Sequence, residues 1–270
     1  MNQPSPEHAT KINFGEPHAA RVWNYWLGGK DNYPADREAG DAVAAVYPAV
    51  VNMATQSRQF LIRAVRWLAA EAGIRQFLDI GTGLPTMQNT HEVAQSAAAD
   101  SKIVYVDNDP LVLAHARALL TNTTPEGVTQ YIHADFHEPE RIISGARGIL
   151  NFDQPIAVMF MGVLGLATDY DAVRSIVATV MDTTPAGSYL VLWDMTSTSE
   201  AAIRAGETYA RSGAVPYVMR GYDQVRDCFE GLELVEPGFV SITLWRPNTR
   251  QIGTVEPIDA YGGVARKPSA

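Results

Sequence analysis

The sequence predicts an α/β fold in which helices flank a mostly parallel β-sheet and a helical extension precedes the sheet. Two observations support this. From about residue 75 onward, apolar segments of strand length alternate with segments of helical periodicity, as in a parallel sheet. Before residue 75 the periodicity is only helical. We expect residues 1–74 to form a helical cap on residues 75–270, the two making one compact unit.

Three helices are predicted in the extension. The first covers residues 19–27, and Gly28 and Gly29 end it as a C-terminal cap. After a polar loop, Pro34 begins a second helix over residues 35–46. Pro48 begins a longer third helix, whose apolar residues recur at helical spacing: Phe60, Leu61, Ala64, Val65 and Leu68.

Strands and helices then alternate along the rest of the chain. Strands are predicted at residues 77–80, 102–106, 128–133, 156–162 and 187–193, and helices at 111–120, 170–181, 199–212 and 222–229. Segments 232–236 and 240–245 are expected to close the sheet as a hairpin-like edge. Because segment 156–162 is apolar throughout, we expect it to be a central strand covered by helices on both faces.

The most informative segment, QFLDIGTGLPT at residues 76–86, runs from a buried strand into a glycine-rich turn. Gly81 and Gly83 allow a sharp turn and a close approach to a ligand. A dinucleotide site would have its third glycine at Thr86. Asp79 precedes the glycines, where a carboxylate would repel a pyrophosphate but attract an ammonium group. An ordinary strand-to-helix turn without a ligand is the alternative. The strands that follow decide between this alternative and a cofactor site.

The next two strands also end in acidic residues. Asp107 lies 26 residues after Gly81, at the spacing of an acid that binds ribose hydroxyls. Asp109 is expected to cap the helix that follows. Asp135 and Phe136 end the third strand, where an acid and an aromatic ring could bind the amine and the face of an adenine.

These motifs resemble the first three cofactor motifs of class I S-adenosylmethionine-dependent methyltransferases. More narrowly, the chain resembles an actinobacterial family described as S-adenosyl methyltransferase, formerly a domain of unknown function. The matching segments cover most of the chain: ARVWNYWLGGKDNYPADRE, FLDIGTGLPTMQNTHEVAQ, VYVDNDPLVLAHARALL, PAGSYLVLWDMT, GLELVEPGFVSITLWRP and GGVARKP. The resemblance implies a Rossmann-like, mostly parallel seven-stranded sheet and S-adenosyl-L-methionine as the cofactor.

The resemblance also implies a set of cofactor-binding residues. Gly162, at the end of the fourth strand, is expected at the methyl-donor end of the pocket. The turn and the other strand ends supply the remaining candidates, which are Asp79, Gly81, Thr82, Gly83, Asp107, Asn108, Asp135 and Phe136.

The LGGKDN region is a further part of the expected site. Tyr25, Gly28 and Gly29 are expected at the cofactor mouth, where Arg21 or Lys30 would supply a cation for the methionine carboxylate. Core packing is the alternative role for this aromatic segment.

No catalytic residue is assigned. Many relatives carry a polar residue after the fourth strand, where this chain has Gly162 and Val163. Methyl transfer depends mainly on proximity and orientation, with a base where the nucleophile needs one. Candidate bases are His91, His133 and Asp194, although a helix surface would also explain His91 and an interior hydrogen bond His133.

Bulk properties restrict the partners. A formal net charge of −9 argues against nonspecific nucleic-acid binding. The single cysteine, Cys228, has no internal disulfide partner, and no Cys/His pair has zinc spacing, so no metal is expected. No signal peptide is predicted at the N-terminus, and the longest apolar run, residues 156–167, is too short to span a bilayer. We expect a cytoplasmic protein without membrane partners; a homodimer is left open.

Three functions follow from these observations. The first is a methyltransferase acting on an unidentified small-molecule acceptor. The second is a regulatory protein that binds S-adenosylmethionine or S-adenosylhomocysteine without transferring a methyl group, because the polar residue after the fourth strand is missing. The third, a nicotinamide-dependent oxidoreductase, is disfavoured by Thr86.

Overall fold

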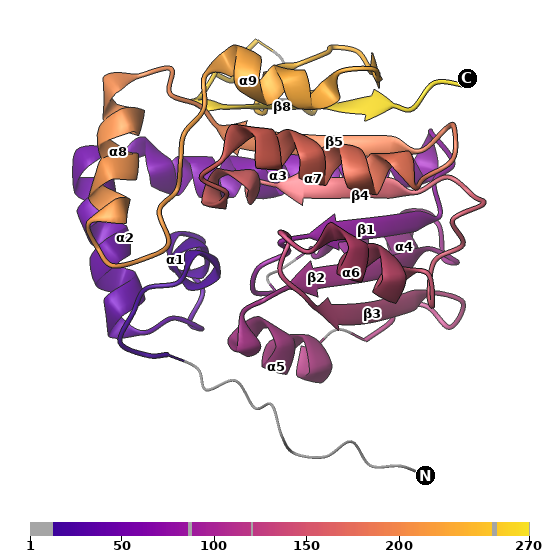
Figure 1. The fold of residues 1–270 in the computed structure, drawn as a ribbon, viewed down its shortest axis with the longest axis horizontal. Coiled ribbons are helices and arrows are strands. Elements are labelled where there is room, and N and C mark those ends of the chain that lie inside the picture. The colour runs from indigo at the N-terminus through magenta and orange to yellow at the C-terminus, as the bar shows by residue number, and fades with distance from the viewer. Residues whose placement is uncertain (1–12, 86–87, 120, 250–252, 270) are drawn as a thin grey trace.

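The computed structural model describes residues 13–85, 88–119, 121–249 and 253–269 (Figure 1). Thr86 and the end of the predicted helix at Leu120 lie outside the described residues. The described chain forms a mixed eight-stranded sheet with the order β3-β2-β1-β4-β5-β8-β6, and β7 also pairs with β8. The predicted α/β architecture is confirmed.

Five strands form the parallel part of the sheet. They are β1 Gln76–Ile80, β2 Lys102–Asp107, β3 Val128–His133, β4 Ala157–Met161 and β5 Tyr189–Met195. Three antiparallel strands close it: β6 Glu233–Leu234, β7 Val240–Ser241 and β8 Ala260–Arg266. Eight strands are described where seven were expected, because β6 and β7 are two short strands that both pair with β8.

The closing edge differs from the sequence prediction in its main strand. Residues 242–245, predicted as strand, leave the sheet and form a turn. The Arg63 guanidinium holds this turn by donating hydrogen bonds to the carbonyls of Ile242 and Trp245 at 2.6 and 2.8 Å. The strand β8 was not predicted. It carries Gly262 opposite Trp193, where a Cβ atom would lie 2.3 Å from the Leu192 carbonyl oxygen and 2.4 Å from Cβ of Trp193, so this strand position has no room for a side chain.

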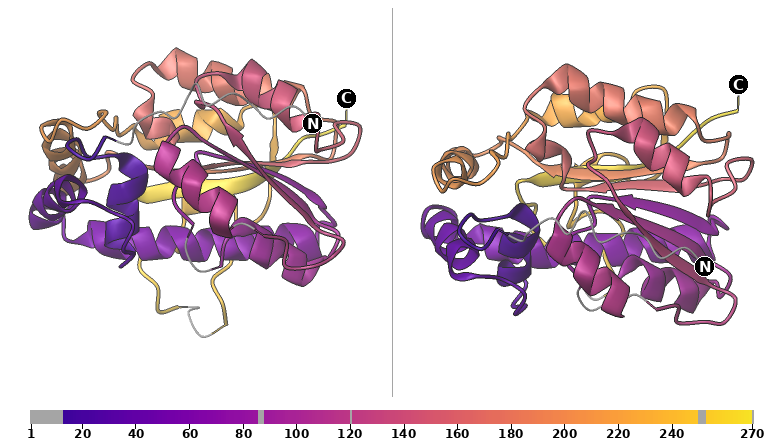
Figure 2. Two further views of the ribbon diagram at one scale, coloured as in Figure 1. Left: turned by 90° about the horizontal axis from the view of Figure 1, so that it is seen from below. Right: turned by 60° about the horizontal axis from the view of Figure 1, so that its bottom comes forward.

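Helices cover both faces of the sheet (Figure 2). One face carries α3 Ala49–Ala70 and α4 Thr90–Ala97, and the other carries α6 Pro139–Ala146, α7 Tyr170–Asp182 and α9 Tyr222–Arg226. Successive side chains along a strand point to opposite faces of the sheet and so pack against different helices. Phe77 packs with α3, whereas Leu78 and Ile80 pack with α6 and α7. Helix α5 Pro110–Leu119 lies beside β3.

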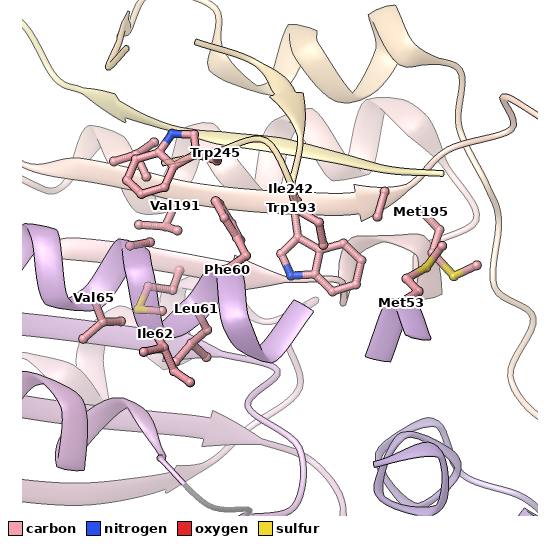
Figure 3. Close-up of a cluster of buried hydrophobic side chains, with 14 of the residues drawn as sticks. Met53, Phe60, Leu61, Ile62, Val65, Val191, Trp193, Met195, Ile242 and Trp245 are labelled. Atoms are coloured by element: carbon pink, nitrogen blue, oxygen red, sulfur yellow. The ribbon is translucent and has the colours of Figure 1, made fainter. Parts of the chain in front are cut away.

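The N-terminal extension shares its core with the sheet. Helices α1 Ala19–Trp26 and α2 Pro34–Val46 lie with α8 Glu200–Ala210 beyond the carboxyl ends of the strands (Figure 1). Figure 3 shows Phe60 of α3 among Val191, Trp193 and Trp245, and the Phe60 and Trp245 rings meet edge to face at 5.6 Å. The three N-terminal helices α1, α2 and α3 therefore contribute buried side chains to the same core cluster as the sheet.

This shared core predicts how the chain unfolds. Phe60 is fully buried, so Phe60→Ala should lower the free energy of unfolding by about 3–5 kcal/mol. Because α3 and the sheet share that core, helical circular dichroism and tryptophan fluorescence should both shift to lower denaturant together. Ile203→Ala on exposed α8 is the control and should cost less than about 0.5 kcal/mol. A separate early transition of the helical signal would show instead that the cap unfolds independently.

Candidate functional site

The glycine-rich turn is held against the end of β2. The backbone N–H groups of Gly81 and Thr82 both donate to the carbonyl of Val106, at 2.8 and 3.1 Å. Gly81 has a φ of +73°, and a Cβ atom there would lie 2.4 Å from the side chain of Val163. Both the left-handed backbone and the close packing therefore require glycine at position 81.

Asp107 joins the turn to the next helix. Its Oδ2 accepts from the N–H of Gly83 at 2.7 Å, and its Oδ1 accepts from the N–H of Asp109 at 3.0 Å. Asp109 in turn accepts from the N–H of Leu111 at 2.9 Å, which confirms its predicted role as the cap of α5. The Asp107 carboxylate is thereby oriented at the carboxyl end of β2.

Asp79 is a buried carboxylate that keeps one oxygen without a hydrogen bond. Its Oδ2 accepts from the Thr90 hydroxyl at 2.7 Å, whereas Oδ1 is buried and has no hydrogen-bond partner among the described residues. Burial raises the pKa of Asp79 to about 6, although the Thr90 hydrogen bond and the positive charge of Arg58 oppose the shift. A cation brought to this site would favour the ionised carboxylate.

The end of β3 carries a small polar network. The Asn108 amide donates to Oδ2 of Asp135 at 2.6 Å, and the His137 ring lies 2.6 Å from Oδ1. Burial raises the pKa of Asp135, but hydrogen bonds from His137 and Asn108 outweigh it, and the net shift is downward. Asp135 is therefore held as a carboxylate beside the buried ring of Phe136.

One cavity connects these strand ends. It is lined by the candidate residues Asp79, Gly81, Thr82, Gly83, Asp107, Asn108, Asp135, Phe136 and Gly162. It continues beneath the helices at the carboxyl ends of the strands, where the lining is mostly apolar and aromatic: Trp23, Trp26, Leu27, Val43, Val50, Leu61, Met161, Trp193, Met195, Tyr209, Val215, Tyr217 and Met219. The cavity thus has a polar part at the strand ends and an apolar part under α1 and α8.

Of the LGGKDN residues only Leu27 lines this cavity, and the expected site residues Tyr25, Gly28 and Gly29 do not. Tyr25 points to α2, where its hydroxyl donates to Asp41 at 2.7 Å. Gly28 has a φ of +76° and ends α1, as the sequence predicted. Gly29 packs on the buried Asn24 side chain, which lies 2.5 Å or less from where a Cβ atom would be. These residues shape the turn between α1 and α2, and Trp23 and Trp26 reach the cavity in their place.

The two cations expected near the methionine carboxylate also lie elsewhere. Lys30 is exposed. Arg21 is buried and forms ion pairs with Asp36 at 3.6 Å and Asp109 at 3.4 Å. Its charge is therefore already matched by two carboxylates.

The three candidate bases lie outside the cavity lining. His91 is buried against the Tyr105 hydroxyl at 2.9 Å, and burial lowers its pKa. The His133 ring lies 3.1 Å from the Asn108 carbonyl oxygen. Asp194 is covered by Tyr217, whose hydroxyl donates to it, and burial raises the pKa of Asp194 to about 6. Tyr217, not Asp194, faces the cavity.

Sequence reasoning missed Arg58, Trp193 and Tyr217, which all line the cavity. Arg58 had a usable signal, because it lies at helical spacing from the buried residues Ala54 and Leu61, on a stripe where a charge is unexpected. Trp193 had none: its ring fills the space beside Gly162, whose φ is +76° and where a Cβ atom would lie 2.6 Å from the indole.

The described residues contain neither a membrane-spanning helix nor a cluster of metal-ligating side chains. No helix in that part of the chain is long and apolar enough to cross a membrane. Nor do three or more His, Cys, Asp or Glu side chains gather there in an arrangement that could hold a metal ion.

Comparison with solved structures supports the fold. A DUF574 family protein from Streptomyces avermitilis is 42% identical, with 96% of this chain and 100% of that chain covered and a TM-score of 0.91. A candidate methyltransferase from Thermobifida fusca is 38% identical, with coverage of 98% and 100% and a TM-score of 0.86. Mitomycin 7-O-methyltransferase, at 13% identity, coverage of 91% and 71% and a TM-score of 0.52, shares the fold alone. The predicted class I methyltransferase fold is confirmed.

A family model places the sequence more directly. No curated protein matches the chain. The model described as S-adenosyl methyltransferase, however, matches residues 5–268. Together with the two relatives above 30% identity, this match shows that the chain belongs to the S-adenosyl methyltransferase family, whose cofactor is S-adenosylmethionine.

Proposed function

We propose that the protein transfers the methyl group of S-adenosylmethionine to a small, largely apolar acceptor. The observation that carries this proposal is the single cavity, in which the polar strand ends continue into an apolar space beneath α1 and α8. A cofactor and an acceptor can meet in such a cavity away from bulk water.

The polar part of the cavity fits the cofactor. We assign Asp107 to the ribose hydroxyls, because its carboxylate is buried and oriented at the end of β2. Asp79 is assigned to the methionine ammonium, because its Oδ1 lacks a hydrogen-bond partner among the described residues. Asp135 and Phe136 are assigned to the adenine. Gly83 leaves the backbone open to the ligand, because a Cβ atom there would have no neighbour closer than the Ala20 side chain at 4.0 Å.

The apolar part of the cavity suits the acceptor. Trp23 and Trp193 lie 6.1 Å apart between ring centroids, and Trp193 packs beside Gly162 at the end of β4. Arg58 is the one Lys, Arg, Asp or Glu side chain that the described helices contribute to the lining. A multiply charged acceptor would lose hydration here without ionic partners. The bound cofactor supplies an electrophilic methyl group, and these residues exclude water and orient the acceptor.

The direct test is transfer of a tritiated methyl group. Incubation of the protein with methyl-tritiated S-adenosylmethionine and a cell extract should label the low-molecular-weight fraction. Trp23→Ala should reduce labelling at least about tenfold because it opens the acceptor side, while the affinity for S-adenosylhomocysteine should change less than about twofold. Tight cofactor binding with no labelled acceptor would favour the regulatory alternative. Label in protein or nucleic acid would contradict a small acceptor.

Cofactor binding itself can be tested at Asp107. Calorimetry should detect S-adenosylmethionine and S-adenosylhomocysteine but not NAD. Asp107→Ala should weaken both adenosyl ligands by about 1.5–3 kcal/mol, the value of a charged hydrogen bond. The control Asp153→Ala removes an exposed acid from the loop before β4 and should change neither affinity. The absence of heat with either adenosyl ligand would refute the proposed function.

A pH dependence follows from Asp79, whose pKa of about 6 is raised by burial. The ionised form attracts an ammonium group, so affinity should be full above pH 7 and fall as Asp79 takes up a proton. S-adenosylhomocysteine should bind about tenfold more weakly at pH 5 than at pH 7. 5′-Methylthioadenosine, which has no ammonium group, should show little change in calorimetry, and Asp79→Asn should flatten the profile. A profile that Asp79→Asn leaves intact would point to another group, such as Asp194.

A further inference from the structure

Arg58 is a cation inside the cavity that no described residue neutralises by contact. It lies on α3, and its side chain lines the cavity near the strand ends. It forms no hydrogen bond and no ion pair with any residue of the described chain. Two other arginines with little exposure are matched, since Arg63 and Arg220 donate to backbone carbonyls.

An unmatched guanidinium in this position requires an explanation. Burial lowers the pKa of Arg58, because the charged form loses hydration. A guanidinium nevertheless stays protonated near neutral pH. The Arg58 side chain is only partly buried, and its guanidinium opens onto the cavity. A charge that has lost part of its hydration without gaining a protein partner is unfavourable, and an anion bound in the cavity would stabilise it.

Asp79 is the acidic residue whose charge interacts with that of Arg58. The charge of Arg58 favours ionised Asp79, and the charge of Asp79 favours protonated Arg58, yet the two side chains are not in hydrogen-bond contact. Oδ1 of Asp79 also has no hydrogen-bond partner in the described part of the chain. The cavity therefore offers one cation and one anion, both with unused hydrogen-bonding capacity. This arrangement is complementary to the ammonium and carboxylate of an α-amino acid.

We propose that Arg58 binds the carboxylate of the methionine moiety of the cofactor while Asp79 binds its ammonium group. The inference rests on the proposed function, since it concerns the same cavity. The planar guanidinium can donate two parallel hydrogen bonds to a carboxylate, which a lysine cannot. Helix α3 thus contributes to cofactor selection as well as to the core. An anionic acceptor bound by Arg58 is the competing possibility, and the test separates the two.

The test compares S-adenosylhomocysteine with its decarboxylated analogue, which keeps the ammonium group and lacks only the carboxylate. Calorimetry on the wild-type protein should give about 10- to 100-fold tighter binding of S-adenosylhomocysteine. In Arg58→Gln that preference should fall below about threefold, because the analogue never contacts Arg58. Arg58→Lys keeps the charge but cannot donate two parallel hydrogen bonds, so this variant should retain an intermediate preference for S-adenosylhomocysteine over the analogue. Arg66→Gln, an exposed arginine on the same helix, should leave the wild-type preference unchanged.

Each other result has a definite meaning. If Arg58→Gln keeps the full preference, the carboxylate binds elsewhere and Arg58 serves the acceptor or the fold. If it weakens both ligands equally, its role is structural and the inference fails. Binding of the analogue reports that each variant is folded. If Arg58→Gln does not fold, an Arg58→Lys preference equal to that of the wild type refutes the bidentate contact. Wild-type protein that binds neither ligand refutes the proposed function itself.

Discussion

The site depends on the buried ion pairs of Arg21. This side chain reaches Asp36 on α2 and Asp109 at the end of β2, and His18 lies 3.1 Å from the same Asp109. Buried ion pairs contribute little net stability, but breaking one leaves an uncompensated charge, so they fix geometry. Here they hold α1 and α2 against the edge of the sheet that carries the acidic strand ends. The cavity exists because this cap is held above that edge.

The polar and the apolar part of the cavity favour different ligands, for different physical reasons. At the strand ends, buried acids such as Asp79 are costly to ionise unless a ligand supplies the opposite charge, which favours a cationic, nucleoside-bearing cofactor. Beneath α1 and α8, the lining around Trp23 and Trp193 offers mostly apolar area, which favours shape and orientation over charge.

The LGGKDN region shows how a recognisable segment can serve the fold. Its expected role at the cofactor mouth came from the family resemblance, whereas the contacts of Asn24 with Asp31 and Asn32 show a compact turn. Gly28 caps the helix, and Tyr25 is directed to α2. The turn still affects the cavity indirectly, since it fixes where α1 ends and hence where Trp26 lies.

The sequence by itself determined the α/β class, the cofactor through the family resemblance, and the acidic strand ends that line the cavity. These features were accessible because Asp79, Asp107 and Asp135 each follow a strand directly, and parallel strands bring their carboxyl ends to one edge. Only the tertiary structure decided the closing strand β8, the packing of the N-terminal helices and the positions of Arg58, Trp193 and Tyr217 in the cavity lining. Those residues come from segments far apart in the chain. They are brought together by helix packing and by the fit of Trp193 against Gly162 and Gly262. Local sequence patterns do not record such long-range contacts.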